Sequence, residues 1–327
     1  MNRIQRIIIG ALLAVTALVL LLSAFNPRFL ERKQKPSDIT IQVILRSNES
    51  EYWQNVALGA QAAVKEFGIT MYITAAYEED DAEGQMQAAM KSLLTKPDAI
   101  VLGASDDEAF APFLKAAADQ HIPVIAIDSV LTSGKTKSYI GMDNYAAGQE
   151  ALDELAKQLK GQGDIAIVAH AEGGINGKLR EQGIVDAMVN HPGINLVDRV
   201  FCSGDRDQCS EAVGQALHKQ PLDGIISLNT KSSLGAAVEL KKKHAGERVK
   251  LIGFDSSPEL LEMLQENQLQ KLIVQNPFSM GYLGIKYAVD AALGHKVPPR
   301  VEMRSMLIDK QNMFWKDNQK LLFPVVQ

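Results

Sequence analysis

The sequence predicts an α/β protein of two lobes, each a parallel sheet with helices on both faces. Short runs rich in Ile, Val and Leu alternate with helical patterns from residue 39 onward. Three of these runs end on a single polar residue, namely Asp128, Asn229 and Asp255. Such runs are typical of strands buried on both faces. Their regular alternation with helices indicates βαβ units, whose right-handed crossovers place helices on both faces.

The predicted elements follow one another in a regular order. Strands are expected at residues 39–45, 70–75, 99–102, 124–127, 165–169, 195–201, 224–228, 250–254 and 272–274, with a weaker one at 138–140. Helices are expected at 51–67, 81–96, 107–120, 145–160, 175–190, 207–219, 232–244, 258–266 and 278–293. About ten strands fit two sheets better than one. The tail from 309 to 327 has no readable structure.

The composition is that of an ordinary globular protein. The chain has 327 residues, of which 46% are hydrophobic and 22% charged, and this length usually divides into two domains. The net charge is −5, so the chain lacks the basic footprint of a nucleic-acid-binding protein. We expect a monomer with no nucleic-acid partner.

The N-terminal segment predicts export or membrane anchoring. Arg3 and Arg6 precede residues 7–25, which contain no charge and are nearly all apolar. Residues 1–25 are therefore a transmembrane signal anchor or a cleaved signal peptide, since the apolar stretch is close to the ~18 residues that span a bilayer. Both alternatives place the rest of the chain outside the cytoplasm. Residues 26–37 are polar and basic, which indicates a linker.

The two cysteines, Cys202 and Cys209, stand seven residues apart across a glycine-containing turn. Outside the cytoplasm they can form a disulfide that closes a small loop. Neither has another Cys or a His at metal-ligand spacing. We therefore predict no metal site and no cofactor.

Asp128, Asn229 and Asp255 are the first candidates for a ligand site. In open α/β sheets, ligands bind outside the carboxyl ends of the strands. A carboxylate accepts hydrogen bonds, and an Asn side chain both donates and accepts them, which suits neighbouring hydroxyls of a small polar molecule. The alternative is that each residue caps the helix that follows it. Three such residues at equivalent positions favour binding.

Four further residues are candidates on weaker patterns. Tyr52 and Trp53 follow the first strand and can stack on a sugar ring, or one of them can pack inward at the helix start. Arg180 lies on a helix and can clamp adjacent oxygens or stay solvated. Gln275 ends an apolar run and, like Asn229, can both donate and accept.

No catalytic pattern is present in the sequence. It contains none of the motifs G-x-S-x-G, H-E-x-x-H and G-x-x-x-x-G-K-[ST], and its six histidines are scattered. We therefore do not expect an enzyme.

Several segments of the chain together resemble a known protein family. From residue 39 to about 308 the chain resembles the type I periplasmic sugar-binding proteins, most closely the ribose-binding-protein branch. The matching segments are Tyr52-Trp53, Gly59-Ala60-Gln61, 122–128 (IPVIAID), 140–144 (IGMDN), 180–183 (REQG), Asn229 and 252–255 (IGFD). The order and spacing of these segments match those of the family.

The resemblance implies two lobes joined by three hinge crossovers, with the ligand bound between them. The N-terminal lobe would comprise residues 38–142 and 276–304, and the C-terminal lobe residues 143–275 and 305–327. By family position, Tyr52 and Trp53 would sandwich the sugar ring. The residues that would hold its hydroxyls are Asp128, Arg180, Asn229, Asp255 and Gln275.

The chain departs from the ribose-binding pattern in two places. That pattern has Arg directly after the first strand-end Asp, whereas this chain has Ser129. It also often has an aromatic residue ahead of the segment that matches Asp205, where this chain has Ser203-Gly204. Arg46, at the end of the first strand, is a candidate replacement for the missing charge. The expected ligand is a monosaccharide or a derivative with an acidic group.

The expected function is capture of this sugar outside the cytoplasm, at the cell membrane if residues 7–25 anchor the chain. The partner is an ABC permease, to which the protein delivers the sugar. The alternative partner is a membrane sensor kinase, to which it reports the sugar. A sugar-responsive transcription regulator shares the same core but would need a basic helix-turn-helix where the apolar segment stands.

Overall fold

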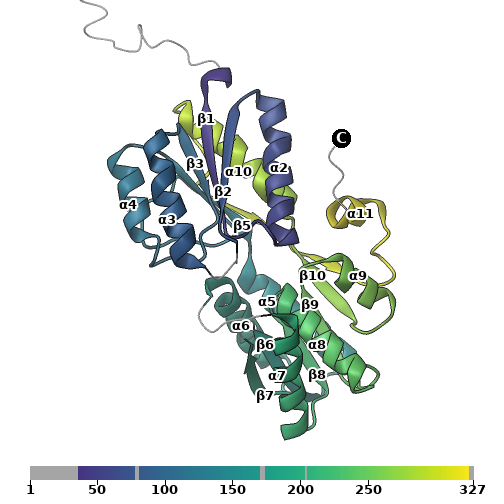
Figure 1. Cartoon of the computed structure of the whole chain (residues 1–327). Helices are drawn as coiled ribbons and strands as arrows, with labels where there is room; N and C mark the ends of the chain where they lie inside the picture. Colours follow the sequence, from purple (N-terminus) through teal and green to yellow (C-terminus); the bar gives the residue numbers. More distant parts are fainter. Residues whose placement is uncertain (1–35, 78–80, 170–173, 203–204, 324–327) are drawn as a thin grey trace, which may run out of the picture.

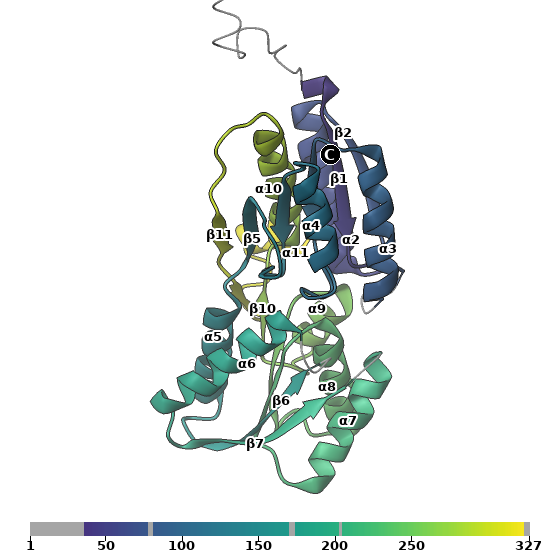
Figure 2. The same cartoon turned by 90° about the vertical axis from the view of Figure 1, so that its left-hand side faces the viewer.

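Two six-stranded sheets divide the structure into two lobes (Figures 1 and 2). The computed structural model describes residues 36–77, 81–169, 174–202 and 205–323. All neighbouring strands are parallel except one pair in the C-terminal lobe. The two-lobe α/β fold that the sequence predicts is therefore confirmed.

Among the described residues, the N-terminal lobe contains one sheet and four α-helices. In spatial order its strands are β11 (Arg300–Met303), β5 (Ser138–Met142), β4 (Val124–Ile127), β3 (Ala99–Leu102), β1 (Thr40–Leu45) and β2 (Thr70–Ala75). Its helices are α2 (Glu51–Phe67), α3 (Ala82–Ser92), α4 (Ala111–Asp119) and α10 (Pro277–Ala292), with short 3₁₀ turns η2 (Pro36–Asp38) and η3 (Leu93–Thr95).

The C-terminal lobe repeats this plan. In spatial order its strands are β12 (Met306–Ile308), β10 (Lys271–Val274), β9 (Lys250–Phe254), β8 (Gly224–Ser227), β6 (Gly163–Ala169) and β7 (Ile194–Phe201), with β12 antiparallel to β10. Its helices are α5 (Asn144–Gln158), α6 (Ile175–Ala187), α7 (Arg206–Lys219), α8 (Thr230–Lys242), α9 (Pro258–Gln265) and α11 (Lys316–Leu322), with the 3₁₀ turn η4 (Met188–Asn190).

Three parts of the chain differ from the sequence prediction. The helix expected from residue 107 begins at Ala111, because the Asp107 carboxylate instead accepts hydrogen bonds from Thr132 and Ser133 across the loop. The strands expected from the sequence end at residue 274, but β11 and β12 follow as two further short strands in different sheets. The tail contains α11, whose Leu322 packs in the core of the C-terminal lobe.

The predicted signal or anchor segment, residues 1–25, lies outside the described residues. Within residues 36–77, 81–169, 174–202 and 205–323, no helix is long and apolar enough to cross a membrane.

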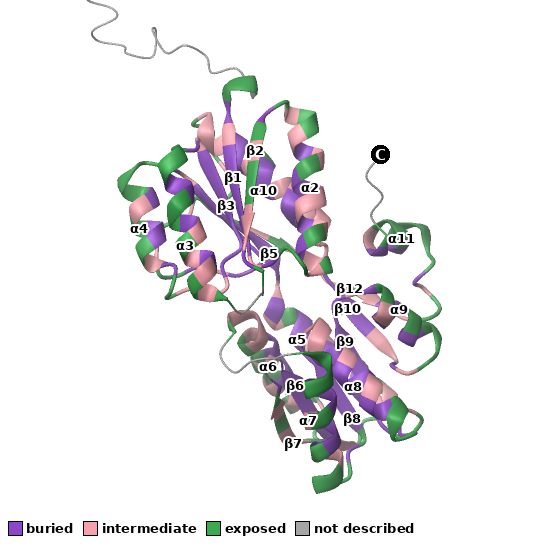
Figure 3. Cartoon of the chain, viewed as in Figure 1, coloured by how far each residue is buried: buried purple, intermediate pink, exposed green. Residues whose placement is uncertain are grey.

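Alternating residues of the central strands face opposite helix layers. In β3, Val101 packs into the core under α2 and α10, whereas Ile100 and Leu102 pack into the core under α3 and α4. The central strands are accordingly buried along nearly their whole length, whereas the edge strands β2 and β7 also carry exposed residues (Figure 3). This arrangement explains why the strands read as continuous apolar runs in the sequence.

The described part of the chain crosses between the two sheets three times. It passes from β5 into α5, from β10 into α10, and from β11 into β12. The first two crossings end in a capped helix. The Asp143 carboxylate accepts from the N–H of Ala146 at 2.9 Å, and the Asn276 side chain accepts from the N–H of Ser279 at 2.9 Å. These caps define where each hinge-proximal helix begins.

Helices α2 and α10 of the N-terminal lobe are in backbone contact through glycines. A Cβ atom at Gly59 would stand 1.9 Å from the carbonyl oxygen of Phe278, and one at Gly281 would stand 1.9 Å from that of Val56. Since no side chain fits in either place, the two backbones touch directly. Helix α10, which starts at a crossing, is therefore packed tightly against α2, which follows β1.

The C-terminal lobe has the equivalent contact between α5 and α6. A Cβ atom at Gly148 would stand 2.0 Å from the carbonyl oxygen of Arg180, and one at Gly183 would stand 2.1 Å from that of Tyr145. Gly148 lies five residues after the cap of α5, as Gly281 does after the cap of α10. Both lobes therefore attach their hinge-proximal helix in the same way.

Cys202 and Cys209 form a disulfide. It joins the residue after β7 to the first turns of α7, as the spacing in the sequence predicts. The bond is a covalent tie within the C-terminal lobe.

We predict that Gly59→Ala lowers the free energy of unfolding by about 2 kcal/mol, because the added methyl group overlaps the α10 backbone and the helices must move apart. Urea unfolding followed by circular dichroism measures this change. Gly177→Ala in α6 is the control, because a Cβ there meets no atom within 4 Å; it should be neutral or stabilise the helix by up to about 1 kcal/mol. Equal effects of the two substitutions would contradict the close-contact account.

Candidate ligand-binding site

Asp128 and Asp255 occupy equivalent positions in the two lobes. Asp128 directly follows β4 and Asp255 directly follows β9, which stand third in their respective sheets. Both residues have a φ of 67°, in the left-handed region. Their N–H groups donate to the carbonyl oxygens of Ile140 and Ile273 on the next strand, at 2.9 and 2.8 Å. Asp is among the few non-glycine residues that tolerate this conformation well.

The Asp128 carboxylate is 5% exposed and accepts three hydrogen bonds. The Tyr52 hydroxyl donates to Oδ1 at 2.8 Å. The Ser129 hydroxyl and the Asn176 amide donate to Oδ2 at 2.9 and 3.1 Å. The guanidinium of Arg46 forms a longer ion pair, with Nη1 3.9 Å from Oδ2. Ser129 therefore supplies a neutral donor to Asp128, and Arg46 supplies a charge.

Arg46 has unused hydrogen-bonding capacity. Its side chain is 24% exposed, yet its Nε atom is buried and has no hydrogen-bond partner within the described part of the chain. Ser105, after the neighbouring strand β3, has a buried hydroxyl that also lacks a partner there. Buried donors without partners carry a free-energy cost that a bound acceptor would relieve.

The Asp255 carboxylate is 8% exposed and is held from within its own lobe. Gln275 donates from Nε2 to Oδ1 at 2.6 Å, and the Thr230 hydroxyl donates to Oδ2 at 3.3 Å. Gln275 is itself 5% exposed. Thr230 was not singled out in the sequence, because a Thr at the first position of a helix carries no distinctive signal.

Asn229 has the helix-capping role that the sequence left open as an alternative. Its Oδ1 accepts from the N–H of Ser232 at 2.9 Å, and the Ser232 hydroxyl bonds in return to the backbone of Asn229, so the pair forms a capping box at the start of α8. The amide nitrogen of Asn229 has no hydrogen-bond partner among the residues described. The cap thus fixes the side chain and leaves its NH₂ group as a donor.

Arg180 is 3% exposed and is held by neutral groups. Its Nε donates to Asn144 Oδ1 at 2.8 Å, and its Nη1 donates to the carbonyl oxygen of Leu228. The guanidinium also lies over the ring of Phe254, 4.5 Å from the centroid. None of the described carboxylates forms an ion pair with it. A buried cation without an anionic partner attracts an electron-rich ligand.

Tyr52 and Trp53 have different environments. Trp53 is 2% exposed and belongs to the core under α2 and α10, with its ring against Gly103 at the end of β3. Tyr52 is half-buried and touches Trp53 edge-to-face, with ring centroids 5.2 Å apart. In this conformation Tyr52 is joined to Asp128, whereas Trp53 is a packing residue.

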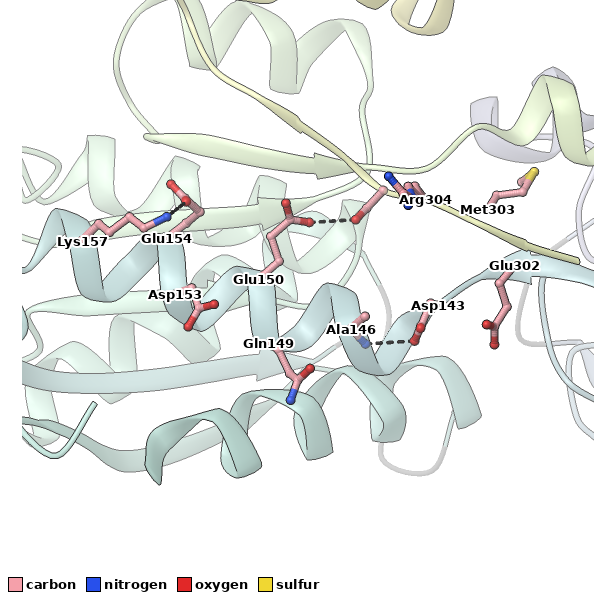
Figure 4. Close-up of a pocket in the computed structure, with 11 residues that line it drawn as sticks. Asp143, Ala146, Gln149, Glu150, Asp153, Glu154, Lys157, Glu302, Met303 and Arg304 are labelled. Atoms are coloured by element: carbon pink, nitrogen blue, oxygen red, sulfur yellow. Dashed lines mark hydrogen bonds and ion pairs between the residues drawn. The ribbon is translucent and has the colours of Figure 1, made fainter. Parts of the chain in front are cut away.

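A separate pocket of about 690 Å³ lies at the hinge (Figure 4). Its lining residues come from α5 and from the β11–β12 crossing: Asp143, Ala146, Gln149, Glu150, Asp153, Glu154, Lys157, Glu302, Met303, Arg304 and Ser305. The carboxylates bond to protein groups; Glu150, for example, accepts from the Ser305 hydroxyl at 2.8 Å. None of the eight ligand candidates from the sequence lines this pocket.

Comparison with known proteins gives one family. A family model described as a periplasmic binding protein domain matches residues 41–296. The D-allose-binding periplasmic protein of Escherichia coli K12 is 24% identical over 274 residues, which cover 79% of this chain and 86% of the relative. The ribose import binding protein of Salmonella typhimurium is 24% identical over 275 residues, which cover 83% and 91% of the two chains.

Solved structures with the same architecture agree with this match. A carbohydrate transporter solute-binding protein from Agrobacterium radiobacter, in complex with D-arabinose, is 29% identical, with a TM-score of 0.83 and coverage of 87% of this chain and 98% of that one. GanP, a glucose-galactose binding protein from Geobacillus stearothermophilus, is 27% identical, with a TM-score of 0.80 and coverage of 84% and 99%.

The family model spans well over half of the chain, and it describes binding proteins rather than enzymes. The expectation that this chain is not an enzyme follows from that membership. The chain belongs to the periplasmic binding protein family.

Proposed function

We propose that this protein captures a neutral monosaccharide between its two lobes and delivers it to an ABC transporter. The observation that carries the proposal is the equivalent pair of strand-end aspartates, one in each lobe and both in the left-handed conformation. Relatives named for binding ribose and allose, and a similar structure in complex with D-arabinose, support a sugar as the ligand.

Each proposed ligand contact has a chemical role. Asp128 and Asp255 accept hydrogen bonds from sugar hydroxyls, and the buried guanidinium of Arg180 donates to sugar oxygens. Asn229 donates through its amide nitrogen, while Gln275 orients the Asp255 carboxylate. We propose Tyr52 as the aromatic residue at the ring, because Trp53 is buried in the core. Arg46 completes the set through its unpartnered Nε.

The charges of these residues favour a neutral ligand. Two carboxylates, Asp128 and Asp255, are matched by two guanidiniums, Arg46 and Arg180. A ligand carboxylate would add a third negative charge to a largely buried site, and uncompensated charge is costly to bury. We therefore favour a neutral sugar over an acidic derivative.

Lobe closure would complete the site. The hinge crossings allow the lobes to approach, and the sugar stabilises the closed form because only that form offers both aspartates at once. Exclusion of water then strengthens each polar contact.

The proposed location is outside the cytoplasm, where the Cys202–Cys209 disulfide is stable. Membrane anchoring by residues 7–25 stays a prediction of the sequence. The alternative partner, a sensor kinase, rests on that segment alone, so we place the ABC permease first.

The sugar assignment predicts selective thermal stabilisation. The purified full-length protein should be stabilised by at least one neutral sugar among D-ribose, D-allose, D-arabinose, D-galactose and D-glucose. At 100 times Kd the stabilisation should reach about 2.7 kcal/mol. D-gluconate and D-galacturonate should give no shift. A shift with the acids alone would refute a neutral ligand, and no shift with any compound would refute the sugar assignment.

We expect Asp128→Asn and Asp255→Asn each to weaken sugar binding by about tenfold or more, because each removes a charged acceptor while Asn keeps the left-handed backbone. Isothermal titration calorimetry with the best sugar of the panel measures the loss, and the melting temperature of each variant is recorded first to establish that it folds. Asp119→Asn, at an exposed ion pair with Lys115, is the matched control. Unchanged affinity in either strand-end variant would remove that residue from the site.

Tyr52 should remain a hydrogen-bond donor throughout the neutral pH range. Burial, together with the Asp128 carboxylate, raises its pKa well above the usual value of 10.0. The stabilisation that comes from the neutral phenol is therefore complete below about pH 10 and is lost as the pH rises towards the folded-state pKa. The difference in unfolding free energy between the unmodified protein and Tyr52→Phe, measured in urea from pH 7 to 11, should stay constant to about pH 10 and then decrease. A difference that stays constant up to pH 11 would show that the pKa of Tyr52 is not raised by folding.

A further inference from the structure

A chain of side-chain hydrogen bonds joins Arg180 to Asp128 across the two lobes. Arg180 Nε donates to Asn144 Oδ1 at 2.8 Å, and Asn144 Nδ2 donates to Asn176 Oδ1 at 3.1 Å. Asn176 Nδ2 then donates to Asp128 Oδ2 at 3.1 Å. Asn144 is the first residue of α5 and Asn176 the second of α6, both in the C-terminal lobe. Asp128 belongs to the N-terminal lobe.

The direction of this chain is fixed by its two ends. A guanidinium can only donate and an ionised carboxylate can only accept. Each amide in between must therefore accept on the side of Arg180 and donate on the side of Asp128. This requirement settles the orientation of both amides, which is otherwise ambiguous for Asn side chains. Asp or Leu at position 176 would interrupt this series of hydrogen bonds, since neither provides the amide donor.

The bond from Asn176 also limits what Asp128 can do. A carboxylate has about four acceptor positions. Tyr52 uses one of them on Oδ1, while Ser129 and Asn176 use two on Oδ2. Once the donors among the described residues are counted, one position, on Oδ1, is left for a ligand hydroxyl. Asn176 thus determines which oxygen of Asp128 is available.

We propose that Asn176 is a positioning residue of the site, which holds Asp128 and Arg180 in register across the hinge and leaves Oδ1 of Asp128 as the acceptor for the ligand. The effect on sugar binding rests on the proposed function. The link between the lobes does not, because it exists without a ligand.

The location of Asn176 supports this role. It is half-buried, one helical turn before Arg180, so the two side chains share a face of α6. The backbone of Arg180 is in turn pressed against Gly148 of α5. The amide therefore projects from a rigid helix pair, and its bond to Asp128 transmits the position of that pair to the other lobe.

Two substitutions test the proposal. Asn176→Ala removes the donor and the acceptor together. Asn176→Asp keeps the shape, removes the donor and sets a second carboxyl beside Asp128. Lys178→Ala, at an exposed residue of the same helix, is the control. All three are made in the full-length protein, and the melting temperature of each is recorded first.

The ligand-free arm measures the link itself by small-angle X-ray scattering. Both substitutions at position 176 should increase the radius of gyration beyond experimental error, because the lobes are no longer tied at this point, and Lys178→Ala should not. A radius unchanged in both variants, at an unchanged melting temperature, would overturn the proposed link whether or not any sugar binds.

The ligand arm uses calorimetry with D-ribose, D-allose and D-arabinose. Asn176→Ala should weaken binding about tenfold, the loss expected for a hydrogen bond to a charged group. An unchanged or higher affinity would overturn the positioning role. Absence of binding by the unmodified protein would instead refute the proposed sugar function, and the scattering result would still decide the link.

The pH profile of Asn176→Asp separates positioning from simple packing. Described charged or titratable groups near the link are Asp128, Arg46, Tyr52, Tyr139, Arg180 and Asp255. Adjacent carboxyls raise the pKa of one of them. Affinity relative to the unmodified protein should therefore recover as the pH falls from 7.5 towards about 5, where the protonated carboxyl can donate again. A pH-independent ratio would contradict the proposal.

Discussion

The left-handed turn at the ends of β4 and β9 is the constraint on which the proposed binding site depends. It turns the chain out of the sheet immediately after the last buried residue, so that Asp128 and Asp255 leave the two cores at equivalent points. Each turn is held by a backbone hydrogen bond to the neighbouring strand. A β-branched residue would be strained there, whereas Asp combines tolerance of the conformation with a charged acceptor.

The second requirement is that each lobe moves as a unit. In the proposed closure, Asp128 and Asp255 can contact the same sugar only if neither lobe deforms as the lobes approach each other. The reciprocal glycine contacts of α2 with α10 and of α5 with α6 provide this stiffness. Each pair joins a helix that begins at a hinge crossing to one that carries a site residue, Tyr52 in one lobe and Arg180 in the other. In the proposed closure, motion at the hinge would reach these two residues through the helix pairs.

The sequence predicted the two-lobe architecture and the strand-end positions of Asp128 and Asp255, because both leave local signals. An apolar run that ends in Asp128 or Asp255 indicates a buried strand, and the Asp marks both the end of that strand and a possible hydrogen-bond acceptor. The sequence left open whether Tyr52 or Trp53 packs inward, because the space that the Trp53 ring fills lies against Gly103, some fifty positions away. Asn176 was missed, although its spacing of four from Arg180 places both on one helix face. Arg46 became a candidate only through the resemblance to the family, which has an Arg at the position of Ser129. The replacement of that charge from a different strand end depends on tertiary structure, which a local pattern does not show.

The central claim is that one neutral sugar is held by aspartates from both lobes. A crystal structure of the protein grown with the best-binding sugar tests it most directly. The account predicts closed lobes, with sugar hydroxyls within hydrogen-bonding distance of both Asp128 and Asp255 and with Asn176 still bonded to Asp128. A sugar that contacts only one of the two aspartates, or that occupies the hinge pocket beside Glu150 instead, would contradict it.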